Sequence, residues 1–82
     1  MNKSSKKSGS PRLEINWVAV GRRIRELRGF DMTQEEFASR VGISQNYLSI
    51  AERGKVEVGA GILLRIGQEF SKSVEWLLTG NE

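Results

Sequence analysis

The sequence predicts an all-α protein, a compact bundle of five short helices, and three observations support that fold class. Apolar residues recur at helical spacing in several segments, and no segment shows the alternation of a β-strand. Capping residues and glycines mark the expected ends of these segments. The chain of 82 residues has no cysteine, so its limited core forms without disulfides, and short helices with short loops bury such a chain economically.

Residues 1–14 are expected to form a disordered basic arm, and residues 15–80 to form the folded domain. The segment MNKSSKKSGSPR has no apolar residue after Met1 and therefore cannot pack into a core. It contains four basic residues and no acid, whereas residues 13–82 contain nine basic and ten acidic residues. The net charge of +3 thus originates in the arm, and the domain must bind an anionic partner through the placement of its charges.

Several classes of protein are excluded by what the sequence lacks. No apolar run approaches the length of a membrane span, and no apolar stretch follows the N-terminal lysines as it would in a signal peptide. Histidine and cysteine are absent, which excludes a histidine-based triad, a cysteine nucleophile and the common zinc sites. We therefore expect a cytoplasmic protein that is not an enzyme and has no catalytic residue, metal, cofactor or small-molecule ligand.

The first helix is expected to begin after Asn16, a favourable N-cap, and to end at Gly29. Its outer face carries arginines and a glutamate, and we assign Arg22 and Arg23 to solvent. Its inner face consists of residues that recur at helical spacing, namely Trp17, Val20, Gly21, Ile24 and Leu27.

Two further helices are expected on either side of Gly42. Thr33 caps the first of them, and Glu36, three residues later, completes a capping box. Ser44 caps the second, which is expected to run to Arg53.

The remaining sequence predicts a loop and two more helices. Residues 55–61, KVEVGAG, are expected to be a loop, and a fourth helix follows over residues 62–70. Ser73 caps a short fifth helix, which Gly80 ends. The large aromatic residues are assigned to the core, and these are Trp17, Phe37, Phe70 and Trp76.

Residues 34–53 have the spacing of two helices joined by a tight turn. Such helices cross steeply, so the first one needs a small residue at the crossing, which Ala38 supplies. Gly42 tolerates the positive φ that the turn requires. Counted from Gln34 as first, Ala38 is fifth, Gly42 ninth and Leu48 fifteenth. All of these positions together, with both caps, are a specific signal for a helix-turn-helix.

This spacing resembles the helix-turn-helix of the lambdoid phage repressor and Cro family, also called the XRE-type family. The likeness extends to IRELRG before the motif, ERGK after it and SVEWLLTG near the end, so that it covers residues 16–80. It implies a nucleoid-associated transcriptional regulator, a repressor, that binds double-stranded DNA sequence-specifically as a homodimer on a palindromic operator. It also implies that the recognition helix, residues 45–53, lies in the major groove.

Four side chains of the recognition helix are expected to contact bases. Gln45 and Asn46 carry a donor and an acceptor side by side, which matches the N6 and N7 edge of adenine. Ser49 lies one turn beyond Gln45, where it either contacts DNA or is simply exposed. Ile50 contacts a thymine methyl group or, if the helix is slightly rotated, fills the space left by the small Ala51.

Four other side chains are expected to contact phosphates. Gln34, at a helix N-terminus, resembles the family glutamine that binds a phosphate and braces the first glutamine of the recognition helix, here Gln45. Arg53 and Lys55 lie at the end of the recognition helix, within reach of the DNA backbone. Tyr47 either presents its hydroxyl to a phosphate or lies along the edge of the core.

Arg28 and Glu52 are expected to form an internal ion pair. In the resembling family an arginine at the end of the first helix bridges a glutamate near the end of the recognition helix. A carboxylate near DNA is costly unless it is neutralised, and removal of either partner would leave a poorly compensated charge. The pair would then hold the recognition helix against the first helix.

Two alternatives to a free-standing repressor stay open on the sequence. The same fold can serve as an antitoxin or an adaptor that holds a protein partner, which a large exposed apolar patch at Leu77 and Leu78 would favour. The chain can also be the N-terminal DNA-binding part of a longer repressor. The lysine-bearing arm either stays free or wraps DNA. Residues 55–61 lie near the dimer interface of the family, and their unusual glycines leave the dimer geometry open.

Overall fold

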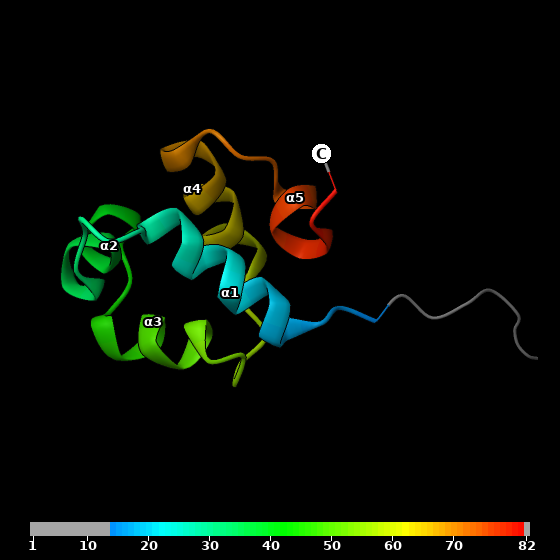
Figure 1. The fold of residues 1–82 in the computed structure, drawn as a ribbon, viewed down its shortest axis with the longest axis horizontal. Coiled ribbons are helices and arrows are strands. Elements are labelled where there is room, and N and C mark those ends of the chain that lie inside the picture. The colour runs from blue at the N-terminus through cyan, green and yellow to red at the C-terminus, as the bar shows by residue number, and fades with distance from the viewer. Residues whose placement is uncertain (1–13, 82) are drawn as a thin grey trace, which may run out of the picture.

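The computed structural model describes residues 14–81, which form five helices around one core (Figure 1). The predicted all-α fold class is therefore confirmed. No helix in this part of the chain is long and apolar enough to cross a membrane. The arm expected over residues 1–14 lies outside the described residues, apart from Glu14. In chain order the helices are α1 (Trp17–Arg28), α2 (Gln34–Val41), α3 (Gln45–Glu52), α4 (Ala60–Phe70) and α5 (Val74–Thr79).

Four of the helices begin at side-chain caps that the sequence predicts. Asn16, Thr33, Ser44 and Ser73 each accept a hydrogen bond from the backbone N–H three residues later, at 2.9–3.1 Å. Each bond satisfies one of the N–H groups that a helix N-terminus leaves without a partner. The Thr33 N–H in turn donates to Glu36 Oε1 at 2.9 Å, which completes the predicted capping box.

The fourth helix begins two residues earlier than the sequence indicated, at Ala60 rather than Ile62. Its N-cap is Gly59, which has an extended backbone and offers no side chain to cap the helix. The Leu63 N–H donates to the Gly59 carbonyl at 3.0 Å and so closes the first turn. The local signal that marked the other four starts is missing here, which is why the predicted boundary was wrong.

The core combines side chains from all five helices. Phe37 is fully buried, and its ring stacks on Phe70 with the ring centroids 4.9 Å apart. Trp17, Phe70 and Trp76 are half-buried and pack against the core from its margin. The largest fully buried side chains are Val20, Ile24, Phe37, Val41, Leu48, Ile66 and Leu77.

Helices α1 and α3 approach each other closely at Gly21. A Cβ atom added to Gly21 would lie 2.4 Å from the carbonyl oxygen of Ala51 and 2.6 Å from that of Glu52. Only glycine allows this approach without a shift of backbone. Helix α1 fills the space beside Ala51, so this residue is buried, with 2% of its surface exposed. Only a small side chain fits there.

Candidate nucleic-acid interface

The turn between α2 and α3 occupies residues 42–44. Gly42 has φ 75° and ψ 31°, the left-handed conformation that favours glycine. The next N–H, of Ile43, donates to the Ala38 carbonyl at 2.9 Å, and Ala38 is buried. From α4, Arg65 Nη1 donates to the Val41 carbonyl at 3.3 Å. Gly42 thus lies in the turn as predicted, Ala38 lies in α2 and accepts a hydrogen bond from the turn, and Arg65 covers the C-terminus of α2.

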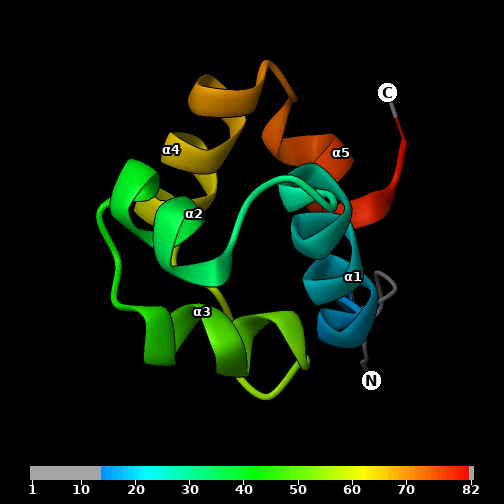
Figure 2. The same ribbon diagram turned by 60° about the vertical axis from the view of Figure 1, so that its left-hand side comes forward.

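Helix α3 forms one outer edge of the molecule, and the other helices lie on one side of it (Figure 2). Leu48 faces inward and is fully buried. Gln45 and Asn46 are exposed at the start of the helix, whereas Ser49 and Ile50 are half-buried. The residues predicted to contact bases are therefore accessible to different degrees, and the two amides are the most accessible of them.

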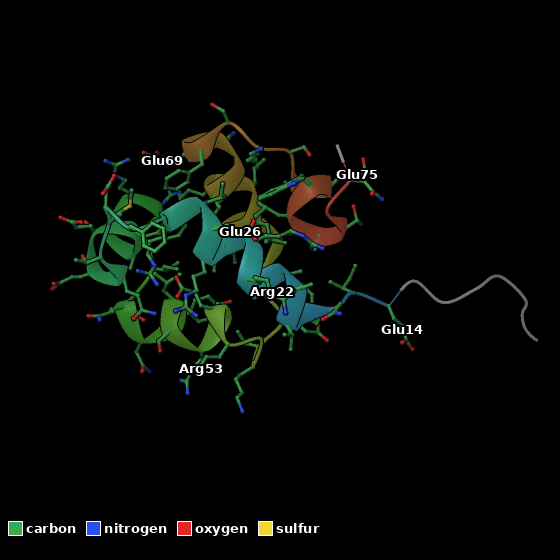
Figure 3. The ribbon with its side chains drawn as sticks, in the orientation of Figure 1. Glu14, Arg22, Glu26, Arg53, Glu69 and Glu75 are labelled. Carbon is green, nitrogen blue, oxygen red and sulfur yellow. The ribbon has the colours of Figure 1, made fainter. Side chains whose placement is uncertain are left out.

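The residues predicted to contact phosphates around α3 also differ in how far they are exposed to solvent. Arg53 ends the helix, is exposed and points away from the other helices (Figure 3). Its Nε donates to the Ser49 carbonyl at 3.3 Å. Lys55 is exposed in the following loop. Tyr47 is half-buried and packs against the core.

The charged residues labelled in Figure 3 are unevenly distributed around the molecule. Arg53 lies at the α3 edge, whereas Glu69 on α4 and Glu75 on α5 lie on the opposite side. The loop after α3 adds both Lys55 and the exposed acid Glu57. An edge that combines exposed cations with neutral amides can attract a polyanion and still offer hydrogen bonds to its uncharged groups.

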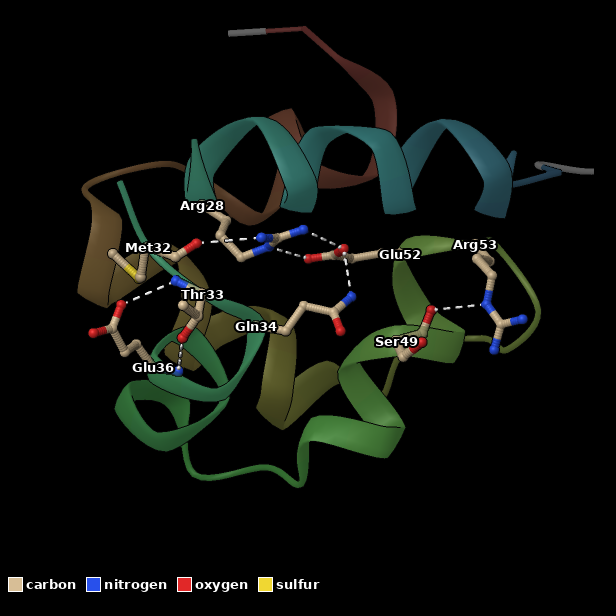
Figure 4. Close-up of polar contacts among 8 residues, drawn as sticks. All are labelled: Arg28, Met32, Thr33, Gln34, Glu36, Ser49, Glu52 and Arg53. Atoms are coloured by element: carbon tan, nitrogen blue, oxygen red, sulfur yellow. Dashed lines mark hydrogen bonds and ion pairs between the residues drawn. The ribbon is translucent and has the colours of Figure 1, made fainter. Parts of the chain in front are cut away.

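An ion pair between Arg28 and Glu52 joins α1 to α3 (Figure 4). Arg28 Nε donates to Glu52 Oε2 at 2.8 Å and Nη2 donates to Oε1 at 2.9 Å, so the contact is bidentate. The side chains are 16% and 5% exposed, respectively. The hydrogen bond to Glu52 raises the pKa of Arg28 above its usual value, and the negative charge of Glu52 adds to this against an opposing effect of burial. Arg28 therefore stays charged and neutralises the only acid of α3.

Gln34 joins this pair from the first turn of α2. Its Nε2 donates to Glu52 Oε1 at 3.0 Å (Figure 4). The resemblance implied Gln45 as the partner of Gln34, whereas the structure shows Glu52 as its partner. Since Glu52 Oε1 accepts from both Arg28 and Gln34, one carboxylate ties three helices together. This arrangement we call the Glu52 network (Arg28, Gln34 and Glu52).

Arg23 has a structural role that the sequence analysis missed. It was assigned to solvent, but it is half-buried, and its Nη1 donates to the Leu77 carbonyl at 2.9 Å. The contact places a cation near the C-terminal end of α5 and ties α5 to α1. The two residues are 54 positions apart, so no local pattern in the sequence could indicate their contact.

The apolar patch that would favour an adaptor does not occur on α5. Leu77 is fully buried and Leu78 is half-buried against the core. The large exposed hydrophobic side chains in the described part of the chain lie elsewhere, at Val18, Phe30 and Leu64.

These elements define a helix-turn-helix protein. A capped first helix, a left-handed glycine turn and a second helix at an outer edge are the parts of such a motif. In DNA-binding proteins of this class the second helix enters the major groove and its N-terminal residues contact base edges.

The chain belongs to the helix-turn-helix family, whose model matches residues 22–77. An uncharacterized HTH-type transcriptional regulator from Archaeoglobus fulgidus is 37% identical over 54 residues, which cover 65% of this chain and 76% of the relative. The protein is accordingly a DNA-binding transcriptional regulator of the XRE type and not an enzyme.

Solved structures show the same similarity. The P22 c2 repressor protein, in complex with a synthetic operator, aligns with a TM-score of 0.70 and 30% identity over 76% of this chain and 96% of that one. The restriction-modification controller protein C.AhdI from Aeromonas hydrophila aligns with a TM-score of 0.67 and 28% identity over the same shares of the two chains. The predicted family is thus confirmed.

Proposed function

We propose that this protein is a homodimeric repressor that binds a palindromic operator and places residues 45–53 in the major groove. The observation that carries the proposal is the outer edge of α3, where exposed amides begin the helix and an exposed arginine ends it. The acid of α3, Glu52, is turned inward and neutralised. The similarity to the P22 c2 repressor, whose structure contains an operator, supports the same function.

Base contact is assigned to the first two turns of α3. Gln45 and Asn46 each present a side-by-side donor and acceptor to solvent, the geometry that pairs with adenine in the major groove. Ser49 and Ile50 lie at the margin of this edge and contact bases with the part of each side chain that stays exposed. For Ile50 the contact is with a thymine methyl group.

Phosphate contact is assigned to residues on both flanks of α3. Arg53 and Lys55 supply cations at its C-terminal end, and Tyr47 supplies a hydroxyl at its N-terminal end. Gln34 is held by Glu52 at the N-terminus of α2, where backbone N–H groups and the helix dipole favour an anion. One N–H of the Gln34 amide donates to Glu52, and the second is available for a phosphate oxygen.

We infer a homodimer because one recognition helix can contact only a few base pairs. One α3 covers a single half-site, so specific binding requires two copies whose recognition helices are about 34–36 Å apart, one turn of the duplex. Two copies related by a two-fold axis then bind a palindrome. The protein acts in the cytoplasm, in association with the nucleoid.

The proposal is tested by selection of ligands from random duplex DNA at physiological salt, which is expected to yield a palindromic consensus. On that consensus, Gln45→Ala should cost about 1–3 kcal/mol of binding free energy and relax specificity at one base position per half-site. Gln68→Ala, which changes an exposed amide on α4, is the matched control and should bind like the wild type.

Lys55→Ala should weaken binding to all duplexes alike and reduce the slope of log affinity against log salt by about 1. Recovery of no consensus would contradict the proposed function. If Gln45→Ala binds the consensus as tightly and as selectively as the wild type, the assigned base contacts are wrong, whereas the proposed function stands.

A further inference from the structure

Phe30 is an aromatic side chain that the fold leaves entirely in solvent. It lies in the connection between α1 and α2, directly after Gly29, and it is fully exposed. Gly29 has φ 67°, a conformation that turns the chain at the end of α1. Burial of such a ring is favourable, and the other phenylalanine rings of the described chain are buried or half-buried. Phe30 therefore forms an apolar ridge without a partner inside the monomer.

One side of the Phe30 ridge is an acidic hollow. Asp31, Glu35 and Glu36 line it, together with the half-buried apolar side chains of Leu27 and Met32. Arginines also reach its margin, but each has an acidic partner elsewhere. Arg28 pairs with Glu52, and Arg40 lies 4.0 Å from Glu69.

The other side of the ridge is a basic hollow. Arg22 and Arg25 are exposed on α1 and line it together with one acid, Glu26. Arg28 and Phe30 complete the lining. Phe30 thus lines two hollows of opposite charge, of which the basic one is built from α1 and residues 29–30 and the acidic one also includes α2.

We propose that the Phe30 ridge is a contact surface between two copies of this chain. A two-fold axis along the ridge places the acidic hollow of one copy over the basic hollow of the other, and the same contact occurs a second time. The two Phe30 rings then bury their surfaces against each other between two complementary charged contacts. The partner is a second copy because one chain carries both an acidic and a basic hollow beside Phe30, and these complement each other.

This contact forms between free proteins and does not depend on the proposed binding of DNA. It also leaves the α3 edge open, because the lining of both hollows comes from α1, α2 and residues 29–32. Two copies that are already joined would raise each other's effective concentration at neighbouring DNA sites.

Sedimentation equilibrium of the full chain over a range of concentrations tests the contact. Phe30→Ser is expected to weaken self-association at least about tenfold without loss of helicity, because the ring packs against nothing in the monomer. Leu64→Ser on α4 removes a side chain that is 51% exposed and is the matched control, with no expected effect. Equal loss in both variants, or a wild-type chain that stays monomeric up to about 1 mM, would overturn the proposal.

A charge exchange tests the two-fold arrangement. Arg25→Glu places a carboxylate in the basic hollow, and Glu35→Arg places a guanidinium in the acidic one, so each variant alone should associate at least about tenfold more weakly. In a mixture, the new carboxylate of one variant faces the new guanidinium of the other, so the mixture should associate more tightly than either variant alone. If the mixture associates no better than either variant by itself, the two-fold contact is refuted.

Discussion

Replacing Gly21 with alanine is expected to destabilise the protein, although alanine is the better helix former. The added Cβ would lie 2.4 Å from the Ala51 carbonyl oxygen and 2.6 Å from that of Glu52, both backbone atoms of α3. Ordinary van der Waals contact requires at least 3.4 Å, so α1 and α3 must separate by about 1 Å. Such a shift also disturbs the Glu52 network, whose bonds depend on the spacing of these two helices.

The magnitude follows from two opposing effects. Forcing an extra methyl group into a packed interior costs about 1–3 kcal/mol, and replacing glycine by alanine within a helix returns about 0.5–1 kcal/mol. The net loss in the free energy of unfolding is then about 0–2.5 kcal/mol, with a central value of about 1 kcal/mol. For a domain of this size, a loss of about 1 kcal/mol lowers the Tm by roughly 4–8 °C.

Thermal unfolding followed by circular dichroism measures the effect, with Gly61→Ala as the matched control. A Cβ at Gly61 in the first turn of α4 meets nothing within 4 Å. The control should therefore gain about 0.5–1 kcal/mol and unfold at a higher temperature than the wild type. If Gly21→Ala is as stable as Gly61→Ala, the close approach of α1 and α3 does not exist and the reasoning fails.

Three further substitutions test the turn, the cap and the Glu52 network by urea denaturation. Arg28→Met should cost about 3 kcal/mol because it leaves the Glu52 carboxylate, 5% exposed, without its cation, and adding Glu52→Leu should recover most of that loss. Gly42→Ala should cost about 1–2 kcal/mol because its φ of 75° is left-handed and its Cβ would displace the Arg65 guanidinium. Ser44→Ala should cost about 1 kcal/mol by removing the cap of α3, and Ser44→Asp should not. The expectation for Arg28→Met, Gly42→Ala or Ser44→Ala fails if that variant unfolds at the urea concentration of the wild type.

Most of the fold could be predicted because four of its helices begin at caps that a short stretch of sequence identifies. The caps at Asn16, Thr33, Ser44 and Ser73 are bonds to a backbone three residues away, so the pattern and the contact are both local. The start of α4 at Gly59 escaped prediction because glycine has no side chain with which to form such a bond.

The site was less accessible to sequence reasoning because its side-chain partners are distant in the chain. Gln34 lies 18 residues from Glu52, and Arg23 lies 54 residues from Leu77. Such contacts depend on how whole helices pack, and no periodicity encodes them. The contact between Arg28 and Glu52 was anticipated only through the family resemblance. Gly21 appeared in the sequence simply as one position of an apolar face, although it sets the distance between α1 and α3.

The same close packing explains why the side of α3 that carries Gln45 is exposed only near the N-terminus of the helix. Gln45 and Glu52 are seven residues apart and hence on nearly the same side of the helix, yet Gln45 is exposed and the Glu52 side chain is buried. The difference arises because α1 reaches the backbone of α3 at Ala51 and Glu52 through Gly21, and Arg28 then covers the carboxylate. Helix α3 therefore presents its amides in its first turn and is held to the domain by its last. An edge this short can contact few base pairs, which is the physical reason that the proposed binding of a specific site requires two copies.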